Sequence, residues 1–465
     1  MGFVLSIIYF ATNYLTPAFL FGPLADLHIE VILATLIIIV SIPALARSFV
    51  VKSPQSLAII GMAIAVFFSV LFTSHGYDGA VDAFLLFIPG GACFFFVCLH
   101  CSTKARLKIL VLMMFLVCMF VVGRGTIDLL RGVPQGTPVP DPDVASNIPI
   151  DVTNSPYFIR QRNGETDWIY RLQGLGEIND PNDLGQLLVC TIPLIFIFWR
   201  EKQLIPNIFF VFLPAAALLF GAYLTHSRGT LVALTAVGIV AGRRRIGTIP
   251  SLVVVGLLVV AAMSLHFTGG RDISASAGED RTALWGESLQ LFKVHPFIGV
   301  GFGLLSDETG GLTAHNSVAV CAAEDGIIGL FFWSLFLFPT LRDAWIGASP
   351  QEVHDAGPVV AEETRFPQPE MTVEEIDKKE INRFEQLLFL SLTGLLVAGW
   401  FLSRTFVSTL FLLGGMTEAI YQMGLRRGMI TSRLRFDRVL PYSAGLTVGL
   451  IILLYVTVRI LNLSR

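Results

Sequence analysis

Charged residues are scarce in this sequence. They make up 14% of the 465 residues, whereas hydrophobic residues make up 54% and the mean hydropathy is +0.70. A soluble protein of ordinary composition carries about 25% charged residues, so a soluble fold is excluded for most of the chain. The apolar runs approach 20 residues, the length at which a helix spans a bilayer. The sequence predicts an all-α polytopic membrane protein, with residues 1–465 as a single membrane domain.

Several signatures of other protein classes are absent. No Walker A sequence, Rossmann glycine fingerprint or internal repeat occurs, which disfavours a nucleotide-binding site. Only Cys98 and Cys101 among the six cysteines have C-x-x-C spacing, so buried thiols are expected rather than a metal or redox site. No signal-peptide cleavage site follows the first apolar segment, which is expected to remain as an anchor.

We predict about 12–13 transmembrane helices from the length of the apolar runs. The candidate spans are residues 3–22, 29–46, 55–74, 82–101, 107–123, 183–199, 205–222, 229–242, 248–266, 317–341, 386–402, 405–423 and 441–459. The span at 229–242 is short, so its helix is expected to begin earlier or to lie tilted.

The distribution of Lys and Arg predicts the orientation. With the N-terminus in the cytoplasm, the inside loops hold 20 of the 32 basic residues, among them Arg243, Arg244 and Arg245. The short outside loops at 23–28 and 75–81 hold none. Cytoplasmic loops of membrane proteins are enriched in Lys and Arg, so a cytoplasmic N-terminus is predicted.

Three long loops follow from this topology. Residues 124–182 form the first long outside loop, whose proline-rich part at 131–156 is expected to be extended. Residues 267–316 form the second outside loop, with a short helix that contains Arg281, Trp285 and Leu289 at helical spacing. Residues 343–384 form an acidic inside loop, which is expected to be a solvated spacer or regulatory segment.

The predicted outer face collects polar residues of one kind. Four arginines lie at helix ends or in outside loops, together with His315 at the start of the tenth span: Arg171, Arg228, Arg281 and Arg404. Arginine suits multidentate binding of phosphate oxygens and remains charged when partly desolvated. Histidine is the usual general base near neutral pH. The cluster therefore indicates a phosphate-binding site with an acid–base residue, although each arginine alone also fits an interface anchor or a solvated residue.

Several sequence motifs lie at these positions. The first is His315-Asn316, followed by nine residues and then Gly326-Ile-Ile-Gly329. The others, in chain order, are "RLQGLGEINDPNDLGQLL" from Arg171 to Leu188, "HSRGTLVAL" from His226 to Leu234, "RTALW" from Arg281 to Trp285 and "HPFIGVGFG" from His295 to Gly303. In this order they resemble the O-antigen ligase and O-antigen polymerase superfamily of bacterial envelope glycan assembly, and the first is similar to the ligase motif. Gly185 stands where the family usually has alanine. The motifs cover about residues 171–333, a third of the chain.

The resemblance implies a metal-independent glycosyltransferase of the bacterial inner membrane, without a cofactor, whose active site faces the periplasm. Its donor would be a glycan linked to a polyprenyl diphosphate such as undecaprenyl diphosphate. The essential histidine of the family corresponds to His315, and its conserved arginines correspond to Arg228 and Arg281. Arg171 and Arg404 would add to diphosphate binding, while Asn182, Trp285, Asn316 and Glu324 would have supporting roles. The partners would be this donor, an acceptor and the lipid bilayer, with no nucleic acid.

The acceptor stays open at the level of sequence. A ligase joins glycan to lipid A-core in lipopolysaccharide biosynthesis, a polymerase joins glycan to glycan, and a related oligosaccharyltransferase joins glycan to a protein hydroxyl. The ligase is favoured by the match at His315-Asn316 and Gly326–Gly329. A transporter of lipid-linked glycan is the alternative from another class. It is disfavoured because transporters place their ionisable residues near the midplane between paired halves.

The tenth span carries carboxylates in its apolar interior, where charge is costly. Asn316 is predicted to cap this helix at the outer face. Glu324 lies nine residues after His315 and is expected to point inward, toward the arginines or a buried water. Asp325, which precedes Gly326, is expected to mark a local break in the helix.

Overall fold

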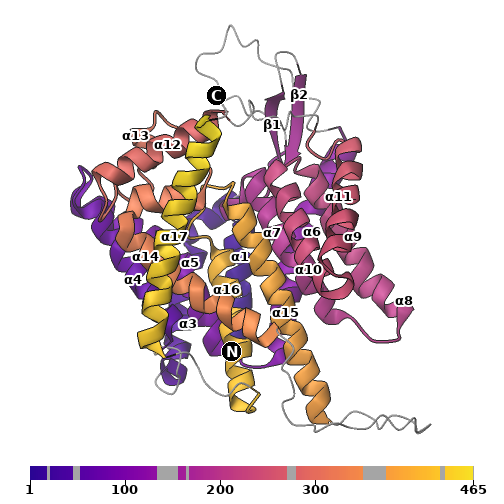
Figure 1. The fold of residues 1–465 in the computed structure, drawn as a ribbon. Helices are drawn as coiled ribbons and strands as arrows, with labels where there is room; N and C mark the ends of the chain where they lie inside the picture. The colour runs from indigo at the N-terminus through magenta and orange to yellow at the C-terminus, as the bar shows by residue number, and fades with distance from the viewer. Residues whose placement is uncertain are drawn as a thin grey trace.

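The computed structural model describes residues 1–17, 21–45, 53–132, 155–163, 167–269, 279–348, 373–429 and 435–463. Helices make up most of these ranges, and the strands within them form one small antiparallel sheet of β1 (Phe158–Asn163) and β2 (Asp167–Leu172) (Figure 1). The predicted all-α class is confirmed, with a hairpin that the sequence did not suggest.

Eight helical segments are long and apolar enough to cross a membrane. They are α4 (Pro54–Leu71), α5 (Gly76–His100), α6 (Lys104–Leu130), α7 (Pro181–Ile195) with the turn after it, α8 (Leu204–Asn207) continued by a π-helical turn and α9 (Leu213–Leu224), α14 (Ser317–Ala348), α15 (Val373–Gly399) and α17 (Phe436–Leu463). Three shorter apolar helices are α1 (Gly2–Leu15), α3 (Ile29–Leu45) and α11 (Thr248–Ser264).

Two further helices, α10 (Arg228–Ile246) and α16 (Ser408–Arg426), complete the set, so each predicted span coincides with a helix over at least part of its length. The helix α10 extends the short span 229–242 at both ends. By contrast, α1 ends at Leu15, because Thr16 adopts a left-handed conformation with φ 37°.

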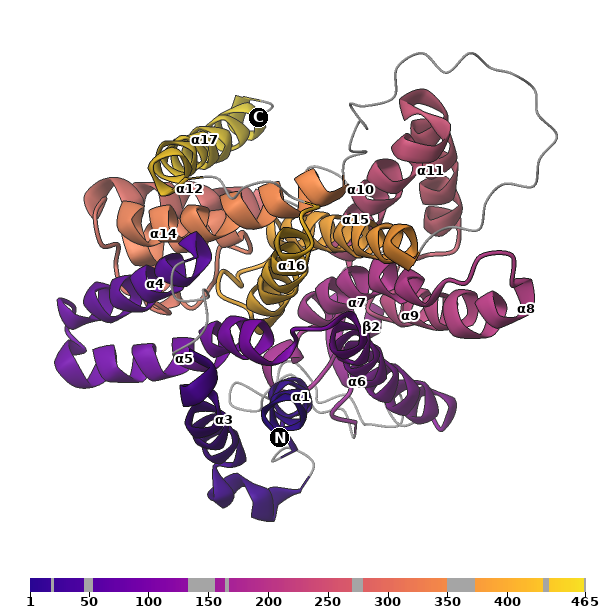
Figure 2. The ribbon, with the colours of Figure 1, turned by 90° about the horizontal axis from the view of Figure 1, so that it is seen from below.

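The centre of the molecule is α16, which contacts α5, α14 and α15 (Figure 2). Nearly all of its residues from Ser408 to Gly424 are buried. Close packing depends on Gly414 and Gly415, since a Cβ atom at these positions would meet Phe336 and Val97 within 3 Å. On the periphery, α11 and α17 expose large apolar residues such as Leu257, Leu453 and Ile460, as expected of surfaces that face lipid.

The two ends of the bundle differ. The hairpin, α12 (Glu279–Val294) and α13 (Leu305–Glu308) lie at one end, and the N-terminus lies at the other (Figure 1). Loops that were predicted to share the inner side contact one another through ion pairs. Lys104 at the start of α6 pairs with Asp377 and Glu380 at the start of α15, and Asp377 also pairs with Arg427 after α16.

The two segments predicted to be mainly loop are partly helical. In the segment predicted to be the first outside loop, α6 continues to Leu130 and the hairpin packs on its end, where a Cβ atom on Gly125 would touch Leu172. The second contains α12, as predicted, and the short α13. Most of the proline-rich stretch 131–156 and the central part of the acidic loop 343–384 lie outside the described residues.

Candidate functional site

Asn182 at the start of α7 connects three segments at the end of the bundle that carries the β1–β2 hairpin. Asp180 caps α7 by accepting a hydrogen bond from the backbone N–H of Asn182 at 2.7 Å. The Asn182 Oδ1 atom in turn accepts from Arg171 Nη2 at 3.0 Å and from Ser227 Oγ at 2.7 Å. Since Ser227 is the N-cap of α10, these bonds place Arg228, the first residue of α10, beside the start of α7.

Arg171 on β2 is held in one position. Its Nε atom donates to the Thr225 carbonyl at 2.9 Å, and Nη1 donates to Gln161 Oε1 at 2.8 Å. Burial lowers the pKa of Arg171 to about 10; nearby Asp180 opposes this shift, and the positive charges of Arg281 and Arg228 add to it. Arg171 therefore remains a cation at neutral pH, within electrostatic range of two other arginines.

Arg281 lies in the first turns of α12 and joins this group. Burial lowers the pKa of its guanidinium, the charge of Arg228 acts in the same direction, and Asp180 opposes it. Three of the four predicted arginines, Arg171, Arg228 and Arg281, thus lie together around Asp180, and we call these three the arginine cluster. Like charges in a partly buried cluster repel one another, so the cluster is suited to an anion with several oxygens.

His315 lies next to the arginine cluster in a constrained segment. Its backbone is left-handed with φ 46°, and its N–H donates to Ser403 Oγ at 2.8 Å. Asn316 then caps α14 as predicted, because its Oδ1 atom accepts from the N–H groups of Val318 and Ala319 at 2.9 and 3.0 Å. These contacts on both sides fix the backbone that carries the imidazole.

The imidazole of His315 is electrostatically coupled to the arginine cluster. Burial lowers its pKa below the usual 6.5, Arg281 lowers it further, and Asp180 raises it. The ring is therefore mostly neutral at pH 7, which is the state that accepts a proton.

Trp285 links α12 to the histidine segment. Its indole Nε1 atom donates to the Ala314 carbonyl at 2.6 Å, and its ring meets Trp400 edge-on with centroids 6.2 Å apart. Arg281 lies one helical turn before Trp285 on the same helix. The tryptophan therefore connects the helix that carries Arg281 to the segment that carries His315.

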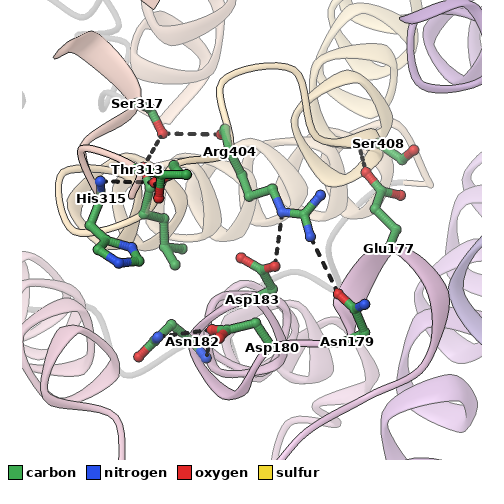
Figure 3. Close-up of polar contacts among 12 residues, drawn as sticks. Glu177, Asn179, Asp180, Asn182, Asp183, Thr313, His315, Ser317, Arg404 and Ser408 are labelled. Carbon is green, nitrogen blue, oxygen red and sulfur yellow. Dashed lines mark hydrogen bonds and ion pairs between the residues drawn. The ribbon is translucent and has the colours of Figure 1, made fainter. Parts of the chain in front are cut away.

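Arg404 lies apart from the arginine cluster. Its Nε atom donates to Asp183 Oδ2 at 2.9 Å, and Nη2 is 3.4 Å from Asn179 Oδ1 (Figure 3). Arg404 and His315 both line a cavity of about 680 Å³ between α1, α5, α7, α14 and α16. Arg404 therefore belongs to this cavity and not to the arginine cluster. His315 and Asp180 line the cavity and also lie within electrostatic range of the arginine cluster.

The carboxylates of the tenth span face protein. Glu324 lies inside, as expected, and lines the same cavity, but its Oε1 atom accepts from the Leu305 N–H at 3.4 Å rather than from an arginine. Asp325 accepts from Ser69 Oγ at 3.3 Å. The predicted break is present immediately after it, where Gly326 has φ 64° and ψ −162°.

The break in α14 is filled by the "HPFIGVGFG" segment. The N–H groups of Val300 and Gly301 donate to the carbonyls of Ala323 and Glu324 at 2.8 and 2.9 Å. In the opposite direction, the Ile327 N–H donates to the Pro296 carbonyl at 2.8 Å. The backbone groups released by the break are thereby paired, which is required inside a membrane.

Sequence reasoning placed His315, the arginine cluster, Asn182, Asn316 and Trp285 correctly at one end, but it missed other residues. Asp183 pairs with Arg404 from a position 221 residues earlier in the chain, and Ser403 holds the His315 backbone from 88 residues later. The two acidic residues around Pro181-Asn182 were the available signal for Asp180 and Asp183. Within the described ranges, no three His, Cys, Asp or Glu side chains are grouped as ligands for a metal ion.

Comparison with known proteins identifies one family. The family model described as O-antigen ligase matches residues 213–334, a range that includes Arg228, Arg281 and His315. No curated protein matches the chain.

Proposed function

Since the chain belongs to the O-antigen ligase superfamily, we propose that it transfers a glycan from a polyprenyl-diphosphate carrier to an acceptor hydroxyl. The observation that carries this proposal is the arginine cluster beside a histidine that is neutral at pH 7. The site would face the periplasm of a bacterial inner membrane, with the lipid tail of the donor in the bilayer.

The arginine cluster would act on the leaving group. As the bond between sugar C1 and the diphosphate oxygen breaks, its electron pair stays with the diphosphate, whose negative charge grows. Arg171 is a cation held by hydrogen bonds to Thr225 and Asn182, and Arg228 and Arg281 lie within electrostatic range of it. Fixed cations stabilise that charge more in the transition state than in the ground state, and no metal ion is required for this role.

His315 would act on the acceptor. Its neutral imidazole takes the proton of the acceptor hydroxyl as the oxygen bonds to C1, and the imidazolium then releases this proton to water. Direct attack on C1 predicts inversion of the anomeric centre. The hydrogen bonds of Ser403 and Asn316 on either side of His315 support this role, since they hold the backbone that carries the ring.

Lipid A-core is the acceptor that we propose, which makes the protein an O-antigen ligase of lipopolysaccharide biosynthesis. The support is the motif at His315-Asn316 and Gly326–Gly329, in which Asn316 caps α14 and Gly326 breaks it. A polymerase or a protein-directed oligosaccharyltransferase would use the same donor site and a different acceptor.

The test is transfer by purified protein in detergent with a labelled polyprenyl-diphosphate glycan. We expect His315→Gln to lower kcat about 10²–10⁴-fold, the usual contribution of a general base. Arg281→Gln should lower it about 10²–10³-fold, as for loss of one transition-state donor. The matched controls are His266→Gln and Arg131→Gln at exposed positions, and both should retain wild-type transfer.

Wild-type activity in His315→Gln and Arg281→Gln would refute the assignment of the site. Lipid A-core, free glycan and a protein acceptor are compared in parallel to identify the acceptor. A transporter would give no product in detergent, because transport needs two compartments and transfer does not.

A further inference from the structure

The cavity beside His315 has an unusual balance of polar groups. Five carboxylates line it, those of Glu30, Glu177, Asp180, Asp183 and Glu324, against a single arginine, Arg404. Arg404 is itself paired with Asp183. The cavity volume of about 680 Å³ is in the range of small-molecule sites, and Phe302 and Phe406, with ring centroids 5.8 Å apart, give it an apolar wall.

A residue with an unpaired polar atom also lines this cavity. Asn13 of α1 is only 8% exposed and lines the cavity. Its Nδ2 atom contacts Cys93 Sγ at 3.9 Å, whereas its Oδ1 atom has no hydrogen-bond partner among the described residues. A buried acceptor without a donor costs about 1–3 kcal/mol, so a ligand that donates a hydrogen bond here would remove a penalty.

The position of the cavity relates it to one of the two substrates. The arginine cluster does not line it, whereas His315 does. In a direct displacement the attacking oxygen and the leaving diphosphate lie on opposite sides of C1. A diphosphate at the arginine cluster therefore leaves the acceptor oxygen on the other side of the histidine, at the mouth of this cavity.

We propose that this cavity is the acceptor subsite and that it selects a sugar residue that carries hydroxyl groups but no phosphate or carboxylate. This inference rests on the proposed transfer reaction and adds the chemical class of the acceptor. The hydroxyl groups of such a sugar supply the donors that the carboxylates and Asn13 Oδ1 can accept. A phosphate on the same sugar would face several carboxylates and be repelled.

The test compares two synthetic acceptors in transfer by the full-length protein. The first is a core saccharide lipid that ends in a neutral hexose, and the second carries one phosphate on that hexose, away from the accepting hydroxyl. We expect wild type to favour the neutral acceptor in kcat/KM by about tenfold or more, as like-charge contact is costly. Asp180→Asn keeps an accepting oxygen for the α7 cap, removes one charge, and should reduce the ratio. Effects on the donor site cancel in this ratio.

Asn13 provides the second variant. Asn13→Ala should raise the KM for the neutral acceptor several-fold and leave the KM for the donor unchanged. Asn13→Asp keeps an accepting oxygen and adds a charge, so it should retain the KM for the neutral acceptor and increase discrimination against the phosphorylated one. A merely structural role of Asn13 would not separate the two acceptors.

A wild-type preference near one, or an unchanged acceptor KM in Asn13→Ala, would overturn the acceptor subsite. Saturation-transfer NMR of the neutral acceptor without donor separates this failure from failure of the proposed function. Binding that Asn13→Ala weakens, in a protein that transfers to neither acceptor, would support the subsite and refute the transfer reaction. Loss of transfer in His315→Gln, with no effect of Asn13→Ala on acceptor binding or KM, would support the transfer reaction and refute the acceptor subsite.

Discussion

At the scale of single residues, His315 lies between two neighbours of opposite charge. Burial disfavours the imidazolium and lowers the pKa of His315, the charge of Arg281 lowers it further, and the charge of Asp180 raises it. Since the neutral ring is the form that accepts a proton, activity should fall as pH falls through this pKa. The wild-type acid limb should therefore lie below pH 6.5, the ordinary pKa of histidine.

Two substitutions should move this limb in opposite directions. Arg281→Gln removes a positive charge, raises the pKa of His315, and should shift the acid limb of log(kcat/KM) to higher pH. Asp180→Asn removes a negative charge, lowers the pKa, and should shift the limb to lower pH. The measurement is the pH profile of transfer at saturating acceptor.

The shift is independent of any loss of activity in either variant, because it is read from the pH at the midpoint of the acid limb and not from the maximal activity. His266→Gln is the control and should leave the limb in place, since His266 does not line the cavity. A limb that stays fixed in both variants would show that His315 is not the titrating base.

Residues whose role depends on local sequence were predicted well. Asn316 caps α14 through atoms two and three residues away, a pattern that is readable from the chain. The pairing of Arg404 with Asp183 joins residues 221 positions apart. No local periodicity contains such a contact, so the sequence placed Arg404 with the other arginines on the basis of side alone.

At the scale of elements, the site depends on the interlock between the broken α14 and the glycine-rich segment before it. A Cβ atom on Gly326 would lie 2.4 Å from the Phe297 carbonyl, and one on Gly299 would lie 2.3 Å from the Glu324 backbone. Both glycines have positive φ, 64° and 71°. Each of these two positions therefore requires glycine for two reasons: the backbone has a positive φ, and there is no room for a Cβ atom.

Gly326→Ala should destabilise the protein by roughly 1–3 kcal/mol from backbone strain alone, and further through the clash with Phe297. Transfer should fall with it, because the distortion reaches Glu324 and the cavity. Thermal unfolding in detergent can be followed with a thiol-reactive dye, since Cys118, Cys190 and Cys321 are buried in the folded protein.

Gly256→Ala is the matched control for this experiment. Gly256 lies within α11, and a Cβ atom there would meet nothing within 4 Å. Alanine is favoured over glycine in a helix by up to about 1 kcal/mol, so the midpoint should stay or rise. Equal midpoints for the two variants would contradict the structural role of Gly326.

Gly299, Gly301 and Gly303 all have positive φ, a conformation that favours glycine where the chain turns. The β1–β2 hairpin was not predicted. Its strands have six residues each and lie in a loop dominated by proline, and two short strands are only marginally stable alone. They form here because Phe158 and Leu172 pack against α6, a contact that no sequence pattern encodes.

At the scale of the whole molecule, each predicted span falls on a helix. Among the described residues, however, eight helical segments have the length and hydrophobicity of a membrane span, fewer than the 12–13 predicted. The ends of the bundle carry different chemistry. Ion pairs among α6, α15 and the chain after α16 gather at the end near the N-terminus, while the arginine cluster and His315 lie at the end with β1, β2 and α12 (Figure 1). Lys379 also pairs with Glu201 from the turn before α8 at 2.6 Å.

These differences predict the orientation, because loops rich in Lys and Arg remain in the cytoplasm. The end with Lys104 and Lys379 should be cytoplasmic and the end with His315 periplasmic. The test introduces one exposed cysteine at each end, Asp307→Cys in α13 and Lys202→Cys before α8. A membrane-impermeant maleimide should label Asp307→Cys in intact spheroplasts and Lys202→Cys only after permeabilisation.

The wild-type chain is the blank for this labelling, since five of its six cysteines are buried and Cys98 is half-buried. The reverse pattern would place His315 in the cytoplasm, where nucleotide sugars are available as donors. The expectation of a lipid diphosphate as donor would then weaken, because it rests on a site where nucleotide sugars are absent. The orientation therefore tests the choice of donor as well as the topology.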